Sequence, residues 1–128
     1  MSIYTLLGIF FSILLFIARK MAMHKETLDG IAIEELKRSG TSIKKVHTIE
    51  FFLYFNSEFS AQKISKILHN IDYDTSVRKS NNEYKWLVIA SKSMIPKLYR
   101  LIKLRKHLSD LAEKENGIYD NWGAAIAN

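Results

Sequence analysis

The stretch that most constrains the fold is the run of β-branched and aromatic residues over 46–55, V-H-T-I-E-F-F-L-Y-F. Its side chains alternate as in a β-strand, with apolar residues on one face and a mixture of polar and aromatic residues on the other. The apolar face comprises Ile49, Phe51, Leu53 and Phe55. This pattern is typical of a sheet with one face on a core and the other partly in water. We predict a central strand here, on which two later helices pack.

The segments that follow predict the rest of a small sheet and its two helices. Apolar side chains recur at helical spacing up to about residue 70 and again over 95–115. The segments 72–79 and 84–91 read as strands on either side of a polar turn, and 118–127 is a fourth extended segment. The order β-α-β-β-α-β predicts an α+β, ferredoxin-like fold, an antiparallel sheet with two helices on one face.

Start and stop signals mark the ends of these helices. Ser57 or Ser60 can cap the first helix, and Pro96 suits the start of the second, where its missing N–H costs nothing. Gly117 is expected to close the second helix. The apolar stripes of the two helices include Ile64, Ile67, Ile71, Leu98, Leu101 and Leu108.

The N-terminal residues 1–18 carry no charged side chain and would span roughly 27 Å as a helix, close to the hydrocarbon thickness of a bilayer. Arg19, Lys20 and Lys25 follow, and the positive-inside rule places them and the later residues in the cytoplasm. A signal peptide would carry its charges before the apolar core, and a buried core helix would need a polar face. We expect a single-pass anchor over 1–20 in a bacterial inner membrane.

A connector helix is predicted over 21–40, before a domain over 41–128. Acidic residues come early in this segment and basic residues late, as the helix dipole favours. Gly40 stands where a left-handed C-cap is expected. Whether this helix continues the anchor helix stays open.

The 128 residues contain no cysteine, so a disulfide framework and thiolate metal sites are excluded. The four histidines are scattered without metal-ligand spacing, and neither a phosphate-binding loop nor a nucleophile motif is present. We therefore expect no enzyme activity, no cofactor and no metal. The formal charge of +6 allows anionic partners, although a solvated lysine-rich surface is the simpler explanation.

Two groups of residues are candidates for contact with a protein partner. Tyr119, Asp120 and Trp122 lie in the distinctive run Y-D-N-W-G, where they form either a recognition patch or a structural bulge with the tryptophan under a helix. Tyr54 is expected on the exposed sheet face.

A second candidate is the run of basic residues that contains no acid between Glu83 and Asp110. Its members are Lys92, Lys97, Arg100, Lys103, Arg105, Lys106 and His107. A solvated helix face explains them, and so does a patch for an anionic partner or a membrane surface. Arg100, Lys103 and Lys106 are the contacts we select. Direct nucleic-acid binding is not indicated, because the run lacks interleaved aromatic residues.

Two segments resemble the family of ribonuclease E inhibitor protein B, RraB: T-I-E-F-F-L at 48–53 and L-A-E-K-E-N-G-I-Y-D-N-W-G at 111–123. The resemblance covers about 26–127. It implies a ferredoxin-like α+β fold and a non-enzymatic role, since members of the family bind the endonuclease of the RNA degradosome and alter its activity.

The chain departs from that family pattern in residues, in charge and in its anchor. Family members usually have histidines where this chain has Phe51 and Phe52, and a glycine in place of Asn121. They are typically acidic and soluble, whereas this chain is basic. A reversed charge removes the electrostatic steering of an acidic regulator toward an arginine-rich nuclease, so the resemblance supports the fold more strongly than the partner.

These observations together predict a non-enzymatic, membrane-anchored protein-binding module that regulates a ribonuclease or another nucleic-acid-processing enzyme by direct contact. An immunity-type protein that neutralises a toxin at the cytoplasmic side of the membrane is the alternative. The identity of the partner, the sign of the regulation and the oligomeric state are not determined by the sequence.

Overall fold

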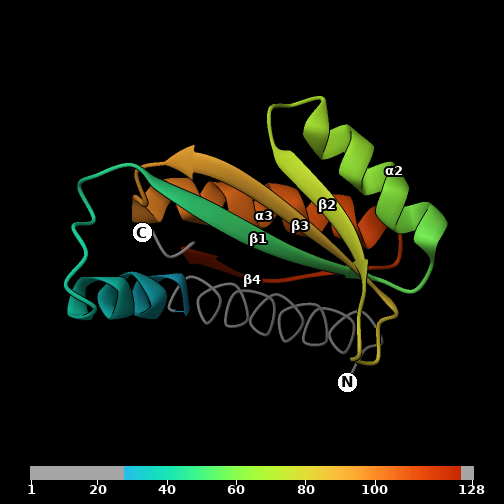
Figure 1. The fold of residues 1–128 in the computed structure, drawn as a ribbon, viewed down its shortest axis with the longest axis horizontal. Helices are drawn as coiled ribbons and strands as arrows, with labels where there is room; N and C mark the ends of the chain where they lie inside the picture. The colour runs from blue at the N-terminus through green and yellow to red at the C-terminus, as the bar shows by residue number, and fades with distance from the viewer. Residues whose placement is uncertain (1–27, 125–128) are drawn as a thin grey trace, which may run out of the picture.

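The computed structural model describes residues 28–124. The predicted anchor and its flanking Arg19, Lys20 and Lys25 lie outside this range. The elements in chain order are β1 (His47–Phe55), α2 (Glu58–His69), β2 (Asp74–Lys79), β3 (Trp86–Met94), α3 (Leu98–Lys114) and β4 (Ile118–Ala124), preceded by a helix over 28–38 (Figure 1). Between residues 28 and 124, no helix is long and apolar enough to cross a membrane.

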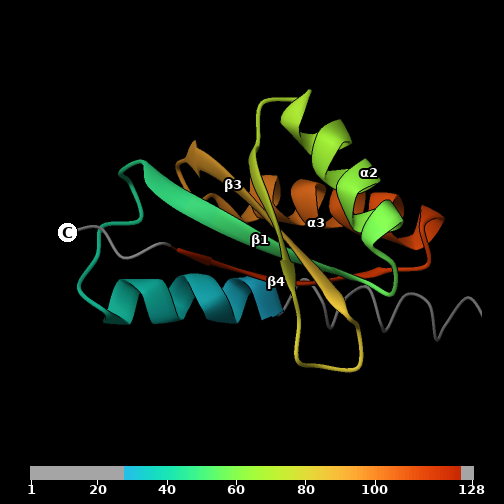
Figure 2. The same ribbon diagram turned by 45° about the vertical axis from the view of Figure 1, so that its right-hand side comes forward.

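The four strands form one antiparallel sheet in the order β2-β3-β1-β4. The predicted α+β class, the order β-α-β-β-α-β and the central place of β1 are therefore confirmed. Figures 1 and 2 show α2 and α3 on the same side of the sheet, with α2 over β2 and β3 and α3 over β1 and β4. The helix over 28–38 runs beside β4 in both views.

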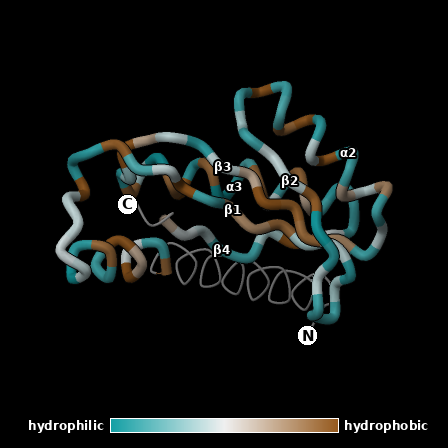
Figure 3. Tube along the Cα trace, viewed as in Figure 1, coloured by the Kyte–Doolittle hydropathy of each residue, from teal (hydrophilic) through white to brown (hydrophobic). Residues whose placement is uncertain are grey.

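The core forms where the apolar face of β1 meets the two helices. Ile49, Phe51, Leu53 and Phe55 are all 0% exposed, as their alternation predicts. Figure 3 shows hydrophobic residues along the central strands and hydrophilic ones in the turn between β2 and β3. The helices contribute Ala61, Ile64, Leu68, Leu101, Leu108 and Ala112.

Three apolar residues that helical spacing assigned to the buried stripes remain substantially exposed. Ile67 and Ile71 are 36% and 42% exposed, and Leu98 is 42% exposed. Ile71 lies beyond the end of α2, and Leu98 begins α3, so neither position extends over the sheet. The prediction of Ile71 and Leu98 as core was wrong because the stripe of a helix is buried only along the length that faces the sheet. Ile67 lies within α2, between the buried Ile64 and Leu68, so it stands at the margin of the buried stripe.

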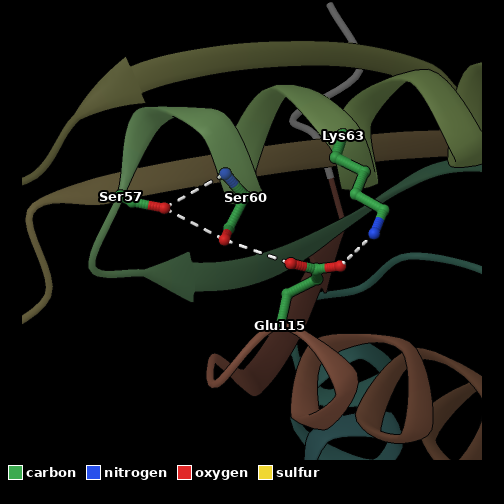
Figure 4. A network of polar contacts seen from close by, with 4 residues as sticks. All are labelled: Ser57, Ser60, Lys63 and Glu115. Carbon is green, nitrogen blue, oxygen red and sulfur yellow. Dashed lines mark hydrogen bonds and ion pairs between the residues drawn. The ribbon is translucent and has the colours of Figure 1, made fainter.

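The N-terminus of α2 is held by a hydroxyl cap and tied to the end of α3. Ser57 is the N-cap: its side chain accepts a hydrogen bond from the Ser60 backbone N–H at 3.1 Å. The Ser60 hydroxyl donates to Glu115 at 3.2 Å, and Lys63 forms an ion pair with the same carboxylate (Figure 4). The Lys63 ammonium, with a smaller contribution from Ser60, holds the pKa of Glu115 below its usual value.

The C-terminal end of α3 differs from the expected glycine stop. The left-handed residue is Asn116, with φ of 56°, and Gly117 follows it. Gly117 is required for space, because a Cβ atom there would meet the Phe55 ring and the Tyr54 carbonyl. Gly40, by contrast, has the left-handed φ of 84° that its position after helix 28–38 predicted.

Candidate functional site

The sheet face opposite α2 and α3 carries an apolar patch. Cross-strand register places Phe52 beside Ile89 and Tyr54 beside Leu87, and all four side chains are half-buried. The Tyr54 ring also lies 6.3 Å from the Tyr84 ring. We call Phe52, Tyr54, Tyr84, Leu87 and Ile89 the open sheet face, since α2 and α3 both pack on the opposite face. Its aromatic and aliphatic surface suits contact with another protein.

Charges of opposite sign lie at the two ends of the open sheet face. Glu50 and Asp74 are both register partners of Ser91, while Arg78 is the partner of Leu87. A shallow cavity of about 170 Å³ runs along this region, with Glu50, Asp74 and Arg78 in its lining. A partner that covers the apolar patch would therefore meet acidic groups at one end and a guanidinium at the other.

The basic residues selected on α3 lie on the opposite side of the molecule from Tyr54. Arg100, Lys103 and Lys106 are exposed on the outer surface of α3, which packs on the inner face of the sheet. Tyr54 points to the other face, because it alternates with the buried Leu53 and Phe55. The structure therefore does not bring these candidates together, and one flat surface of a partner cannot cover both.

Arg105 fits neither the solvated face nor the partner patch considered for the basic run, because it is 7% exposed. Its guanidinium donates two hydrogen bonds to Asp29, from Nε at 2.8 Å and from Nη2 at 2.7 Å. Asp29 itself is 0% exposed and comes from the helix over 28–38. This bidentate pair therefore joins that helix to α3 in the interior of the domain.

A bulge in β4 explains the burial of the Y-D-N-W-G run. Trp122 is the register partner of Phe51 and Tyr119 of Leu53, so Asp120 and Asn121 together stand opposite one residue of β1. Both aromatic side chains therefore turn toward the helices. Trp122 is 7% exposed and its indole N–H donates to Asp29 at 3.1 Å.

Tyr119 packs against the buried pair of Asp29 and Arg105. The Arg105 guanidinium lies 5.1 Å from the Tyr119 ring centroid, a cation–π contact. Burial raises the pKa of Tyr119 above its ordinary value, and the hydroxyl has no hydrogen-bond partner within the described residues. The hydrogen bond from Arg105 to Asp29 raises the pKa of the guanidinium, with burial opposing it. We call Asp29, Arg105, Tyr119 and Trp122 the interior polar cluster.

The interior polar cluster has the architecture of a structural tie rather than a recognition patch. Tyr119 and Trp122 lie inside, whereas Asp120 is exposed on β4. Contact of Asp120 with a partner stays a prediction. Within residues 28–124, no group of three or more histidine, aspartate or glutamate side chains could hold a metal ion.

Sequence reasoning missed Asp29, although a signal for it exists. Asp29 lies four residues before the buried Ile33 on its helix, and Arg105 lies four after the buried Leu101 on α3. Each charge therefore stands on the apolar stripe of its own helix. Two opposite charges on two apolar stripes are the pattern of a buried ion pair.

The fold and surfaces define a small α+β domain with one sheet face covered by α2 and α3 and one open sheet face. The sequence model of the family described as Regulator of ribonuclease activity B matches residues 26–124, and the chain belongs to that family. The resemblance found in the two sequence segments is thereby confirmed. This family consists of regulators of ribonuclease activity rather than enzymes. No curated protein matches the chain.

Proposed function

We propose that this protein regulates a ribonuclease by direct contact through its open sheet face. Family membership supports ribonuclease activity as the regulated process. The observation that carries the contact is the half-buried patch around Phe52, Tyr54 and Ile89, which the packed helices leave uncovered within the described residues. Tyrosine and other large apolar side chains at the centre of such a patch are the residues that dominate binding free energy.

The basic outer surface of α3 has a different role in this proposal. Because Arg100 and Lys103 lie on the side away from Tyr54, they steer an anionic partner or lipid toward the outer surface of α3 and not toward the open sheet face. Such steering raises the association rate at low salt and is screened at high salt.

We place this activity at the cytoplasmic side of a membrane. The uncharged residues 1–18 and the following Arg19, Lys20 and Lys25 support a single-pass anchor with the domain inside. Protease added outside sealed cells should leave the domain intact and should digest it after the membrane is opened. Digestion in sealed cells would refute this orientation.

The contact itself is tested with the full chain recovered from solubilised membranes. A ribonuclease should co-purify with the wild type, and Tyr54→Ser should weaken that binding about thirtyfold or more, because an interface aromatic at a hot spot contributes at least about 2 kcal/mol. The matched control is Phe59→Ser on α2, where the phenylalanine is 78% exposed and lies outside the open sheet face.

Two results would contradict this proposal. One is the absence of any ribonuclease from the wild-type complex, both with and without residues 1–20. The other is equal loss of ribonuclease binding in Tyr54→Ser and Phe59→Ser, since the two aromatic residues belong to different surfaces.

A further inference from the structure

A second concave surface lies between the helix over 28–38 and the start of α3. This cleft has a volume of about 610 Å³, and none of the residues of the open sheet face line it. Its lining includes the buried Ile33 and Pro96 and the exposed Leu98 and Tyr99. Leu98 and Tyr99 are 42% and 62% exposed, so the cleft offers apolar surface that the described part of the chain leaves in water.

The charged residues around this apolar cleft are predominantly cations. Lys37, Lys44 and Lys97 line it, together with one acid, Glu34, which is already paired with Lys37 at 3.0 Å. Lys97 is also the N-cap of α3, a helix with no side-chain cap bond and no acid in its first turn. The positive end of the helix dipole therefore adds to the potential of the lysines.

Charge identifies the kind of molecule that fits. We propose that this cleft binds a segment of a separate protein in which apolar side chains are flanked by carboxylates. The apolar side chains would cover Leu98 and Tyr99, and the carboxylates would pair with Lys44 and Lys97. This is recognition of an amphipathic segment in a groove, with electrostatics selecting the partner.

Other occupants fit this chemistry less well. Residues 1–18 carry no charge, and 19–27 carry Arg19, Lys20 and Lys25 against the single acid Glu26, so this segment offers no acidic partner. A second copy would bring another net charge of +6. A bilayer surface presents anionic groups, but it is flat and would leave a cleft of this volume unfilled. The inference does not depend on binding at the open sheet face.

The test uses the full chain in nanodiscs of zwitterionic lipid and two fluorescein-labelled amphipathic peptides with the same leucine stripe. One peptide carries glutamates beside the stripe and the other carries lysines. Fluorescence anisotropy should show at least about tenfold tighter binding of the glutamate peptide, because each exposed ion pair contributes modestly and several act together. The double variant Lys44→Glu/Lys97→Glu should abolish or reverse this preference.

Matched variants separate the cleft from general surface charge. Lys66→Glu/Lys85→Glu makes the same change in net charge at exposed positions outside the cleft, and it should keep most of the preference. Leu98→Ser should weaken binding of the glutamate peptide, whereas Phe59→Ser, at a residue 78% exposed on α2, should not. Circular dichroism checks that each variant is folded.

Three outcomes would overturn the proposal. Equal affinity for the two peptides, or no binding of either peptide, would exclude an acidic apolar segment as the ligand. Equal effects of the two lysine double variants would assign the preference to net charge alone. The third outcome is a wild type that binds neither peptide. If Lys44→Glu/Lys97→Glu then abolishes self-association, the cleft belongs to a second copy; if it abolishes binding to anionic vesicles, the cleft belongs to a membrane surface.

Discussion

The buried pair of Asp29 and Arg105 makes a strong prediction about stability. Asp29→Ala removes a carboxylate that accepts three hydrogen bonds, at 2.8 and 2.7 Å from Arg105 and 3.1 Å from Trp122. It leaves a guanidinium that is 7% exposed without its counter-ion. Breaking a buried pair in this way costs about 3–5 kcal/mol, because the remaining charge stays desolvated. The unpaired indole N–H adds about 1 kcal/mol.

The double variant separates the pair from its two members. In Asp29→Leu/Arg105→Met both charges are gone and apolar side chains of similar length occupy the site, so the loss should be at most about 1–2 kcal/mol. The single changes Asp29→Leu and Arg105→Met should therefore each cost more than the double change, with an interaction energy of at least about 2 kcal/mol. The measurement is urea unfolding of the full chain in mild detergent, followed by tryptophan fluorescence.

The surface pair of Glu34 and Lys37 is the control. Its N–O distance is 3.0 Å, but both side chains are about half exposed, at 58% and 47%. Breaking it with Glu34→Ala should cost no more than about 1 kcal/mol. If Asp29→Ala is as mild as Glu34→Ala, or if the two single changes at the buried pair simply add, the argument from desolvation is refuted.

Three further predictions follow from the interior and the helix ends. Tyr119→Phe should leave the free energy of unfolding unchanged or raise it by up to about 1 kcal/mol at neutral pH, since the buried hydroxyl lacks a partner in the described residues. Burial raises the pKa of Tyr119 in the folded protein, so the free energy of unfolding of the wild type should fall as pH rises above about 10, where the unfolded tyrosine ionises. Tyr119→Phe should reduce that fall. An equal fall in the two proteins, measured by urea unfolding at a series of alkaline pH values, would contradict this. Gly117→Ala should lower stability by about 1–3 kcal/mol, because the added Cβ meets the Phe55 ring and the backbone carbonyl of Tyr54; an unchanged urea midpoint would show that both the ring and the β1 backbone move aside freely. Glu115→Gln should destabilise the protein at neutral pH, and the difference from wild type should shrink below about pH 4, since Lys63 lowers the folded pKa of this carboxyl; a difference that grows on acidification would exclude that ion pair as the cause.

Local patterns in the chain predict most of its secondary structure. The alternation over 46–55 is sufficient to assign β1 and its buried face, because the period of two fixes which side chains share a side. Capping chemistry offers Ser57 or Ser60 for the start of α2, and the structure selects Ser57. Element ends are predicted less well: β3 continues to Met94, and α3 begins two residues after Pro96.

The candidate contact residues illustrate the limit of such patterns. Arg100, Lys103 and Arg105 are close in sequence, yet only Arg105 turns inward. Its direction depends on Asp29, which lies 76 residues earlier, and no local rule joins the two. Likewise Trp122 follows Asp120 closely, but the bulge in β4 sends the tryptophan into the interior and leaves the aspartate in water.

The amino-acid sequence by itself determines the family, the order of strands and helices and the apolar face of β1, since motif, period and capping are properties of neighbouring residues. Only the tertiary structure decides that Asp29 and Arg105 pair inside the domain, that Tyr54 and the α3 cations face opposite directions, and that a lysine-lined cleft opens beside Leu98. These features arise where elements distant in the chain pack together. Whether a side chain is buried or paired with a charge depends on the residues that face it from the other element.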